Sequence, residues 1–256
     1  MAKLIILTAA LALVASCAAH SNLTESAASG SKFKGLKDLQ VGVNLWMTDE
    51  QAAEKTYGNI TDWDVSEVPD FNHLFSVEVP NAPSFNADIS RWITSQATNM
   101  HSMFWGATKF NADISKWVTS KVTYMESMFS GATNFNADLS EWDTSKVTSM
   151  YATFYQATSF NSASVRDISK WITSQVTDMS WMFAGATNFN TVISAWTTSQ
   201  VTNMDATFYQ ATKFNQPGVC KWDHSNLTAP AAVSMFTGSG MPSGCGWKSN
   251  DEGGLK

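Results

Sequence analysis

The chain has 256 residues, of which 16 are Lys or Arg and 22 are Asp or Glu, so its formal net charge is −6. This modest acidic balance argues against nucleic-acid phosphates and anionic lipid as partners. The length alone suggests one or two domains. The 11 Trp and 15 Phe residues recur at regular spacing, which assigns most of them to a core.

Residues 1–19 predict a secretory signal peptide, because they combine one lysine, an apolar centre and small residues at the end. A transmembrane anchor is the alternative, which the short apolar run disfavours. The run ending at Cys17 also fits a bacterial lipoprotein cleavage site. Lipidation of Cys17 would then attach the protein to a membrane, whereas in a eukaryotic host Cys17 is removed with the peptide. Residues 20–35 are rich in Ser, Ala and Gly and predict a flexible linker.

Residues 36–62 predict an N-terminal cap. Thr48 and Gln51 match a capping box, with Thr48 as the N-cap residue. We expect the helix to run to about Tyr57 and to stop at Gly58. A stack of repeats needs such a cover at its end.

Residues 63–247 repeat one unit. Tryptophans mark the unit at steps that are mostly 25 or 29 residues long, and a fixed period of this length indicates a stacked solenoid. The markers are Trp63, Trp92, Trp117, Trp142, Trp171, Trp196 and Trp222. Other large apolar residues keep the same phase, so one coil cannot bury them alone and stacked coils form a continuous core.

Two elements are expected in each coil. Met100, Met103 and Phe104 have helical spacing, so residues 99–107 predict a short helical turn that Gly106 ends in a left-handed conformation. The segment from Asp113 to Trp117 predicts a short strand. The extra residues at 162–166 predict a loop that bulges out of the stack.

The repeat resembles that of the BspA-type leucine-rich-repeat surface proteins, which occur in bacteria and some unicellular algae. The resemblance covers about residues 60–247. It is carried by Trp117, Val122, Thr123, Met125, Met128, Phe129, Gly131, Ala132, Phe135, Asn136, Asp138 and Ser140. It implies an α/β solenoid of the leucine-rich-repeat type, a secreted or cell-surface location and adhesive or recognition roles. It implies no catalytic residue. Departures include Thr153 and Thr207 for the second Met, Gln156 and Gln210 for Gly, and Val192 for Asp.

Cys220 and Cys245 lie one repeat period apart, each two residues before a tryptophan. Neighbouring strands lie about 4.8 Å apart, which brings equivalent side chains within reach of a bond. We therefore predict a Cys220–Cys245 disulfide that fastens the last coil, consistent with export. Two reduced, buried cysteines are the alternative. Residues 248–256 are expected to form a flexible tail.

Two polar columns have structural interpretations. An Asn column is expected inside the stack, where it would satisfy main-chain groups at each turn. It comprises Asn86, Asn111, Asn136, Asn161, Asn190 and Asn215. An Asp column is expected to close turns, with weak Ca²⁺ binding between coils as the alternative. It comprises Asp88, Asp113, Asp138 and Asp167.

Two threonine columns are expected to face solvent, either satisfying turns or forming a flat hydroxyl face. One comprises Thr94, Thr119, Thr144, Thr173 and Thr198, and the other Thr98, Thr123, Thr148, Thr177 and Thr202. Five aromatic residues break the repeat consensus and are the candidate binding residues, because aromatic anchors dominate binding surfaces. They are Trp105, Tyr124, Tyr155, Trp181 and Tyr209.

No catalytic motif is recognisable, the four histidines lack metal-ligand spacing, and we expect no enzyme activity, metal or cofactor. Asn22, Asn59 and Asn226 begin glycosylation sequons, which matter only in a eukaryotic secretory route. The sequence favours a secreted or cell-surface recognition or adhesion protein for a protein or glycan partner. The alternative is a structural protein that binds a lattice such as wall polysaccharide, mineral or ice through its threonine columns. The oligomeric state is left open.

Overall fold

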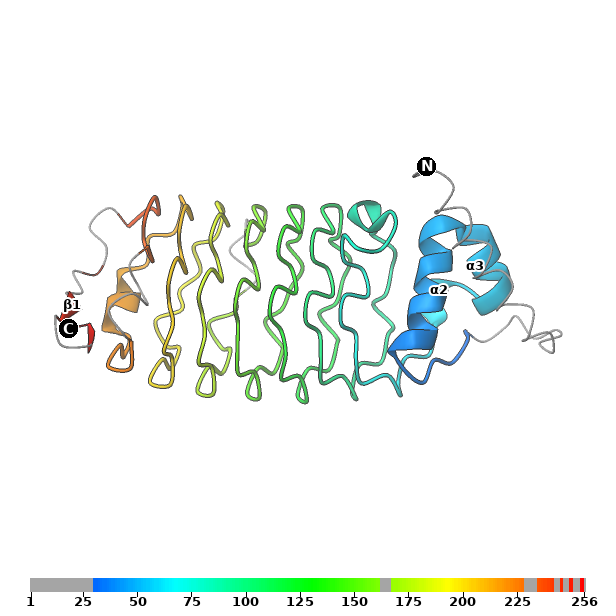
Figure 1. Ribbon diagram of the computed structural model, residues 1–256, viewed down its shortest axis with the longest axis horizontal. Coiled ribbons are helices and arrows are strands. Elements are labelled where there is room, and N and C mark those ends of the chain that lie inside the picture. The colour runs from blue at the N-terminus through cyan, green and yellow to red at the C-terminus, as the bar shows by residue number, and fades with distance from the viewer. Residues whose placement is uncertain are drawn as a thin grey trace, which may run out of the picture.

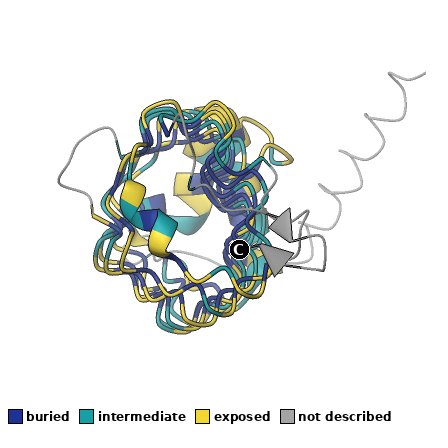
Figure 2. Cartoon of the chain, turned by 90° about the vertical axis from the view of Figure 1, so that its left-hand side faces the viewer, coloured by how far each residue is buried: buried dark blue, intermediate teal, exposed yellow. Residues whose placement is uncertain are grey.

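The computed structural model of the protein describes residues 30–161, 167–227, 234–241, 245, 249–250 and 254–255. Coils of chain lie side by side along the long axis, with two helices at the N-terminal end (Figure 1). Viewed along the stack the coils superpose, so that equivalent residues form columns (Figure 2). The expected signal peptide, Cys17 and Asn22 lie outside the described residues, as does the expected loop at 162–166.

The cap consists of α2 (Leu36–Thr48) and α3 (Glu50–Tyr57). Helix α2 buries Leu39, Val43 and Trp46, which share one helical face, and Trp46 meets Trp63 of the first coil edge to face at 6.0 Å. The N-cap prediction was off by one residue. Asp49 caps α3 by accepting from the amide of Ala52, whereas Thr48 ends α2. The stop at Gly58 is confirmed, with a φ of 78°.

The expected linker ends earlier than residue 35. Ser31 and Phe33 donate backbone hydrogen bonds to Tyr57 and Asp64, and Phe33 is buried against Trp63. Residues 30–35 therefore belong to the cap. Phe33 is the sequence feature that indicates this boundary, and it was overlooked because the surrounding stretch is rich in Ser and Gly.

The local elements expected in each coil differ from those observed. Residues 101–106 form consecutive turns and not a helix, because Ser102 and Gly106 take left-handed φ values of 52° and 69°. The segment 113–117 is not a strand; a hydrogen bond from the Trp117 amide to the Ile114 carbonyl folds it. Three short 3₁₀ helices occur among the described residues, Ile60–Asp62, Ala82–Ser84 and Pro217–Lys221.

Aromatic columns form the core. Trp92 and Trp117 stack at 6.4 Å between ring centroids with planes 5° apart, and Phe104 and Phe129 stack at 5.7 Å. From Trp92 to Trp222, the indole nitrogen of each tryptophan in the column donates to a carbonyl of the preceding turn of the stack, as Trp117 does to Ile89. Buried indole N–H groups need such partners. The columns therefore combine apolar burial with satisfied polar groups.

The first threonine column is buried, contrary to the prediction. Thr119 is 2 % exposed, and its hydroxyl donates to the carbonyl of Asp143 in the next coil over 3.0 Å. The second column lies at the surface, where Thr123 donates back to the carbonyl of Thr98. A buried threonine presents a methyl group to the core while its hydroxyl satisfies a main-chain acceptor. The threonines therefore join coil to coil.

The asparagine column satisfies main-chain amides as predicted, although it lies at the surface and not inside, and the amides belong to the next coil. The Asn111 amide donates to the Asn86 side-chain oxygen over 2.7 Å, and the Asn136 amide donates to that of Asn111 over 2.8 Å. The link recurs one period apart, so it fixes the register between neighbours.

The C-terminal end is fastened by the predicted disulfide between Cys220 and Cys245, whose Cα atoms lie 4.9 Å apart. Beyond it, β1 (Ser249–Asn250) pairs antiparallel with β2 (Gly254–Leu255). This short ribbon occupies part of the segment that the sequence predicts as a flexible tail.

Candidate ligand-binding face

One eight-residue segment of each coil carries the main-chain pairing, and we call these the ladder segments. They are residues 70–77, 99–106, 124–131, 149–156, 178–185 and 203–210. Alternate amides of a ladder segment donate to the next coil; Met100, Ser102, Phe104 and Gly106 donate to Tyr124, Glu126, Met128 and Ser130 at 2.7–2.9 Å. Isolated parallel bridges join the first residues of successive ladder segments, as between Asn99 and Tyr124. The ladder therefore holds neighbouring segments rigidly side by side.

Left-handed residues recur within the ladder segments. They are the fourth residue of every ladder segment and the eighth residue of every segment from 99–106 onward. Some of them carry large side chains, including Trp181 at a φ of 59° and Gln156 at 54°. A side chain in this region costs about 1–2 kcal/mol relative to the right-handed form. The inter-coil hydrogen bonds offset that cost.

The ladder segments contain no Lys or Arg. Their charged residues at near-neutral pH are acidic, namely Asp70, Glu126, Asp178 and Asp205. Exposed basic residues lie instead beside the tryptophans, as Arg91, Lys116 and Lys170 do. The face formed by the ladder segments therefore has an acidic and aromatic character.

The first residue of a ladder segment normally closes a turn with its side chain. Asn99 accepts from the His101 amide over 3.0 Å, Asp178 from the Ser180 amide over 2.7 Å, and Asn203 from the Asp205 amide over 3.1 Å. Tyr124 is the exception in this column, because a phenol ring cannot reach back to the amide two residues on. Its side chain is 53 % exposed. The chain therefore gives up a turn hydrogen bond at Tyr124 and gains an exposed ring.

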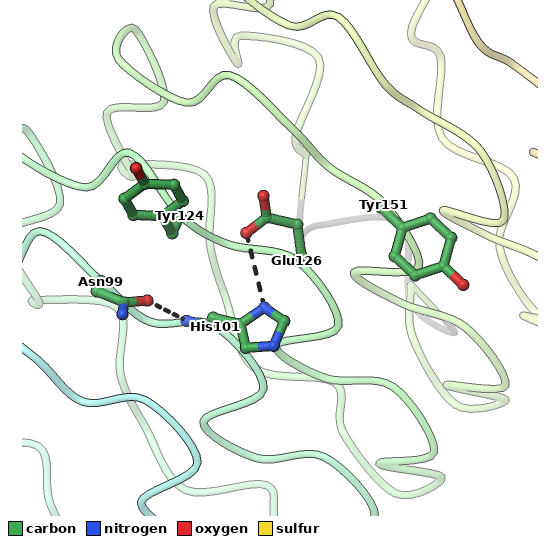
Figure 3. Close-up of a pocket in the computed structure, with 5 residues that line it drawn as sticks. All are labelled: Asn99, His101, Tyr124, Glu126 and Tyr151. Atoms are coloured by element: carbon green, nitrogen blue, oxygen red, sulfur yellow. Dashed lines mark hydrogen bonds and ion pairs between the residues drawn. The ribbon is translucent and has the colours of Figure 1, made fainter.

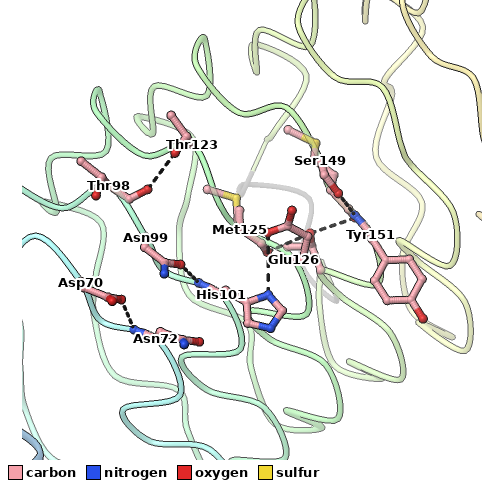
Figure 4. Close-up of polar contacts among 12 residues, drawn as sticks. Asp70, Asn72, Thr98, Asn99, His101, Thr123, Met125, Glu126, Ser149 and Tyr151 are labelled. Atoms are coloured by element: carbon pink, nitrogen blue, oxygen red, sulfur yellow. Dashed lines mark hydrogen bonds and ion pairs between the residues drawn. The ribbon is translucent and has the colours of Figure 1, made fainter. Parts of the chain in front are cut away.

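Tyr124 lines an open depression across three coils (Figure 3). The other lining residues are Asn99, His101, Glu126 and Tyr151. Glu126 lies between the two tyrosines in this view, and its Oε2 is 3.7 Å from the Nδ1 atom of His101. Figure 4 shows how the turns of Asn99 and Ser149, and the Thr98–Thr123 link, hold the surrounding backbone.

The carboxylate of Glu126 is held close to the protein. Its side chain is 20 % exposed, and Oε2 is buried without a hydrogen-bond donor from the described residues. Tyr151, at the equivalent position of the next coil, is 44 % exposed. A partly desolvated carboxylate between two exposed rings can receive a polar or cationic group and an adjoining apolar surface.

Aromatic and imidazole rings continue this face on both sides. His73 meets His101 at 5.2 Å and Trp105 at 6.2 Å, both edge to face. Farther along the stack, Trp181 lies 6.0 Å from both Tyr155 and Tyr209. The five aromatics predicted from the sequence thus all lie on ladder segments, but not together. Tyr124 lines the depression, Trp105 contacts His73, and Tyr155, Trp181 and Tyr209 form a separate row.

Sequence reasoning missed His101, Glu126 and Tyr151. They occupy the same position in successive coils, 25 residues apart, next to the predicted Tyr124 column. Comparing equivalent positions of successive coils would have placed these three residues side by side. The prediction instead selected single residues that depart from the repeat consensus.

The aspartate column closes turns, as the structural interpretation expects. Asp113 accepts from the amide of Ser115 over 2.9 Å, and the same bond joins Asp88 and Ser90. The backbone and side-chain hydrogen bonds from Ser115 lower the pKa of Asp113 below its ordinary value, against partial desolvation and the charge of Asp88. Within the described residues no three His, Cys, Asp or Glu side chains are grouped to hold a metal ion.

Two of the predicted sequons fall on described residues. Asn59 is exposed, accepts from the Thr61 amide and donates to Glu54. Asn226 is exposed and donates to the carbonyl of Ser199. Among the helices of the described ranges, none has the length and apolarity to cross a membrane.

Comparison with known proteins gives one family. A family model described as "Mycoplasma protein of unknown function, DUF285" matches residues 43–166 and 161–241, which together span most of the chain. Neither the curated proteins nor the solved structures contain a significant match.

Proposed function

We propose a function from the premise that this chain belongs to the DUF285 family, whose own function is unknown. The chain acts as a secreted or cell-surface recognition protein. It binds a protein or glycan partner on the face formed by its ladder segments and catalyses no reaction. The BspA-type leucine-rich-repeat solenoid is the finer family assignment that goes with this proposal.

The observation that carries the proposal is the exchange at Tyr124. Equivalent residues Asn99, Asp178 and Asn203 use their side chains to close a turn, and Tyr124 instead exposes an aromatic ring in the depression. Local stability gives no reason for this residue, because the turn loses a hydrogen bond worth about 1 kcal/mol. Residues that lower local stability are typical of functional sites.

The rigidity of the ladder supports recognition rather than catalysis. Backbone hydrogen bonds fix each segment against its neighbours, so a partner meets rings whose positions are already set. Rigid aromatic side chains then give contact area at low entropic cost. The candidate residues comprise one carboxylate and one imidazole in an open depression, without a nucleophile paired to a base.

The proposal includes export from the cell. Two features support export: the signal peptide expected at residues 1–19, and the disulfide, a bond typical of oxidising compartments. In a eukaryotic route, the exposed Asn59 and Asn226 are the glycosylation candidates within the described part of the chain.

A binding screen with matched variants tests the proposal. The purified protein is applied to arrays of glycans and of secreted proteins, and hits are measured by surface plasmon resonance. The test variant replaces Trp105, Tyr124 and Tyr151 by Ser. The control variant replaces Ile93, Val118 and Ile172 by Ser, which removes equally exposed apolar side chains beside the tryptophans.

We expect saturable binding to one partner that the test variant loses by at least about tenfold and the control retains. The absence of any saturable hit, or equal loss in both variants, would overturn the proposal. The lattice alternative keeps one supporting observation, the surface position of the second threonine column. Ice- or mineral-growth inhibition that survives the test variant would favour it.

A further inference from the structure

We propose that the depression between Tyr124 and Tyr151 takes a basic side chain, Lys or Arg, from a protein partner. This inference rests on the proposed recognition function and names the chemistry of its central contact. It follows from the residue composition of the face, from the position of Glu126 and from the two flanking rings.

The charge of the face selects the sign of the ligand. Ladder segments carry Glu126 and three aspartates and contain no Lys or Arg. Hence an anionic group would meet like charge there and no cation to balance it. A cationic group meets complementary charge, and the effect is greatest at Glu126, whose side chain is only 20 % exposed.

The state of Glu126 identifies the group to be contacted, its carboxylate. Its Oε2 is buried without a hydrogen-bond donor from the described residues, and the nearest polar partner is His101 Nδ1 at 3.7 Å, beyond hydrogen-bond range. A buried acceptor without a donor is costly, and more so when it is charged. Because Oε2 itself is enclosed, an ammonium or guanidinium group in the depression pairs with the negative charge of Glu126 from the solvent side of the carboxylate.

The flanking rings suit the rest of such a side chain. Tyr124 and Tyr151 are about half exposed and stand on either side of Glu126 (Figure 3). Aromatic faces attract cations within about 6 Å and also pack against aliphatic stems. A lysine or arginine side chain presents both a stem and a charged head, whereas a neutral sugar presents no charge for Glu126 to pair with.

The same column supplies a matched control. Asp205 holds the position of Glu126 in a later coil and carries the same charge, but it lies outside the depression. The Tyr124→Asn variant removes the ring without destabilising the turn, because asparagine restores the turn hydrogen bond found at Asn99. Loss of binding in a variant that is at least as stable as the parent cannot be attributed to unfolding.

The test is an NMR titration of the full chain with small probes, followed through tyrosine ring resonances. The probes are the N-acetyl methylamides of lysine, arginine and norleucine, together with glucosamine and glucose. Norleucine has an aliphatic chain like that of lysine without the ammonium group. We expect the two basic probes to saturate shifts at Tyr124 and Tyr151, and norleucine to bind at least about tenfold more weakly.

The variants decide where the probes bind. Glu126→Gln and Tyr124→Asn should each weaken the basic probes by about tenfold, and Asp205→Asn should leave their affinity unchanged. Equal binding of lysine and norleucine, or equal weakening by Glu126→Gln and Asp205→Asn, would overturn the inference. Tighter binding of either sugar than of lysine would also overturn it and make the depression a sugar site. None of these results decides the proposed function, because the array experiment tests that function independently of the titration.

Discussion

The indole nitrogen of Trp117 donates a hydrogen bond over 3.2 Å to the backbone carbonyl of Ile89, one coil earlier. The same bond joins Trp142 to Ile114 and Trp196 to Ile168. A tryptophan therefore does two things at once in each coil. Its ring stacks on a neighbouring tryptophan, and its buried N–H donates to a main-chain carbonyl of another coil, which explains why the repeat is marked by Trp and not by another aromatic residue.

Replacing Trp117 with Phe should separate these two roles. The phenyl ring keeps the stacking partner but removes one of the two hydrogen bonds that the Ile89 carbonyl accepts, the other coming from the Trp92 amide. It also leaves a small gap in the core. We expect the free energy of unfolding to fall by about 2–4 kcal/mol, from the lost hydrogen bond and the lost packing. Chemical denaturation measures it. A loss below about 1 kcal/mol would mean that the hydrogen bond contributes nothing.

Replacing threonine by valine should lower the free energy of unfolding by different amounts in the two threonine columns. Thr119→Val removes a buried hydroxyl and leaves the Asp143 carbonyl unsatisfied, for an expected loss of about 1–3 kcal/mol. Thr123→Val removes a hydroxyl at the surface, where water replaces it, and should cost less than about 1 kcal/mol. Thermal unfolding of the two variants side by side checks the order. The reverse order would place the first column at the surface after all.

The disulfide should act locally. In the chain-entropy account, closing the 25-residue separation between Cys220 and Cys245 contributes about 3 kcal/mol. Coils contact only their neighbours, so the double variant Cys220→Ser/Cys245→Ser should expose the end of the stack first. Hydrogen exchange is expected to rise at residues 203–227 and to stay unchanged at 99–131. A uniform rise along the chain would contradict this local effect.

Acid should weaken the aspartate turns. Hydrogen bonds from the Ser90 and Ser115 amides, and then from their hydroxyls, hold the pKa values of Asp88 and Asp113 below the ordinary 3.8. A lowered folded-state pKa stabilises the fold above the unfolded value, and this contribution is lost as the pH falls from about 3.8 through the folded pKa. Asparagine keeps the acceptor without the titration. The Asp88→Asn/Asp113→Asn variant should therefore lose less stability than the parent below about pH 4.

Denaturant curves measured between neutral pH and pH 3 provide this comparison. The parent and the variant should differ little in the pH dependence of stability near neutrality, because the parent carboxylates are ionised there. Parallel losses in both proteins below pH 4 would assign acid sensitivity to other carboxylates.

The sequence predicts what depends on the period alone. The columns of Trp and Phe, the Asn86–Asn111 link and the Cys220–Cys245 bond all follow from residues one coil apart being neighbours. It does not predict conformations within a coil. Met100, Met103 and Phe104 have helical spacing, but the left-handed Ser102 turns the chain and its amide pairs with the next coil.

The candidate site was only partly predictable for the same reason. Tyr124 stands out as a departure from the repeat, whereas Glu126 and His101 become neighbours only through the order of stacking. The inward position of Thr119 was also missed, because a hydroxyl beside Ser and Lys resembles a surface residue until its acceptor in the next coil is known.

Hydrogen exchange of the protein with a partner identified on the arrays tests the central claim most directly. If the face formed by the ladder segments is the recognition surface, amides in residues 99–106, 124–131 and 149–156 should exchange more slowly in the complex, and those in residues 113–122 should not change. Protection confined to residues 113–122 and the equivalent segments beside other tryptophans would contradict the account.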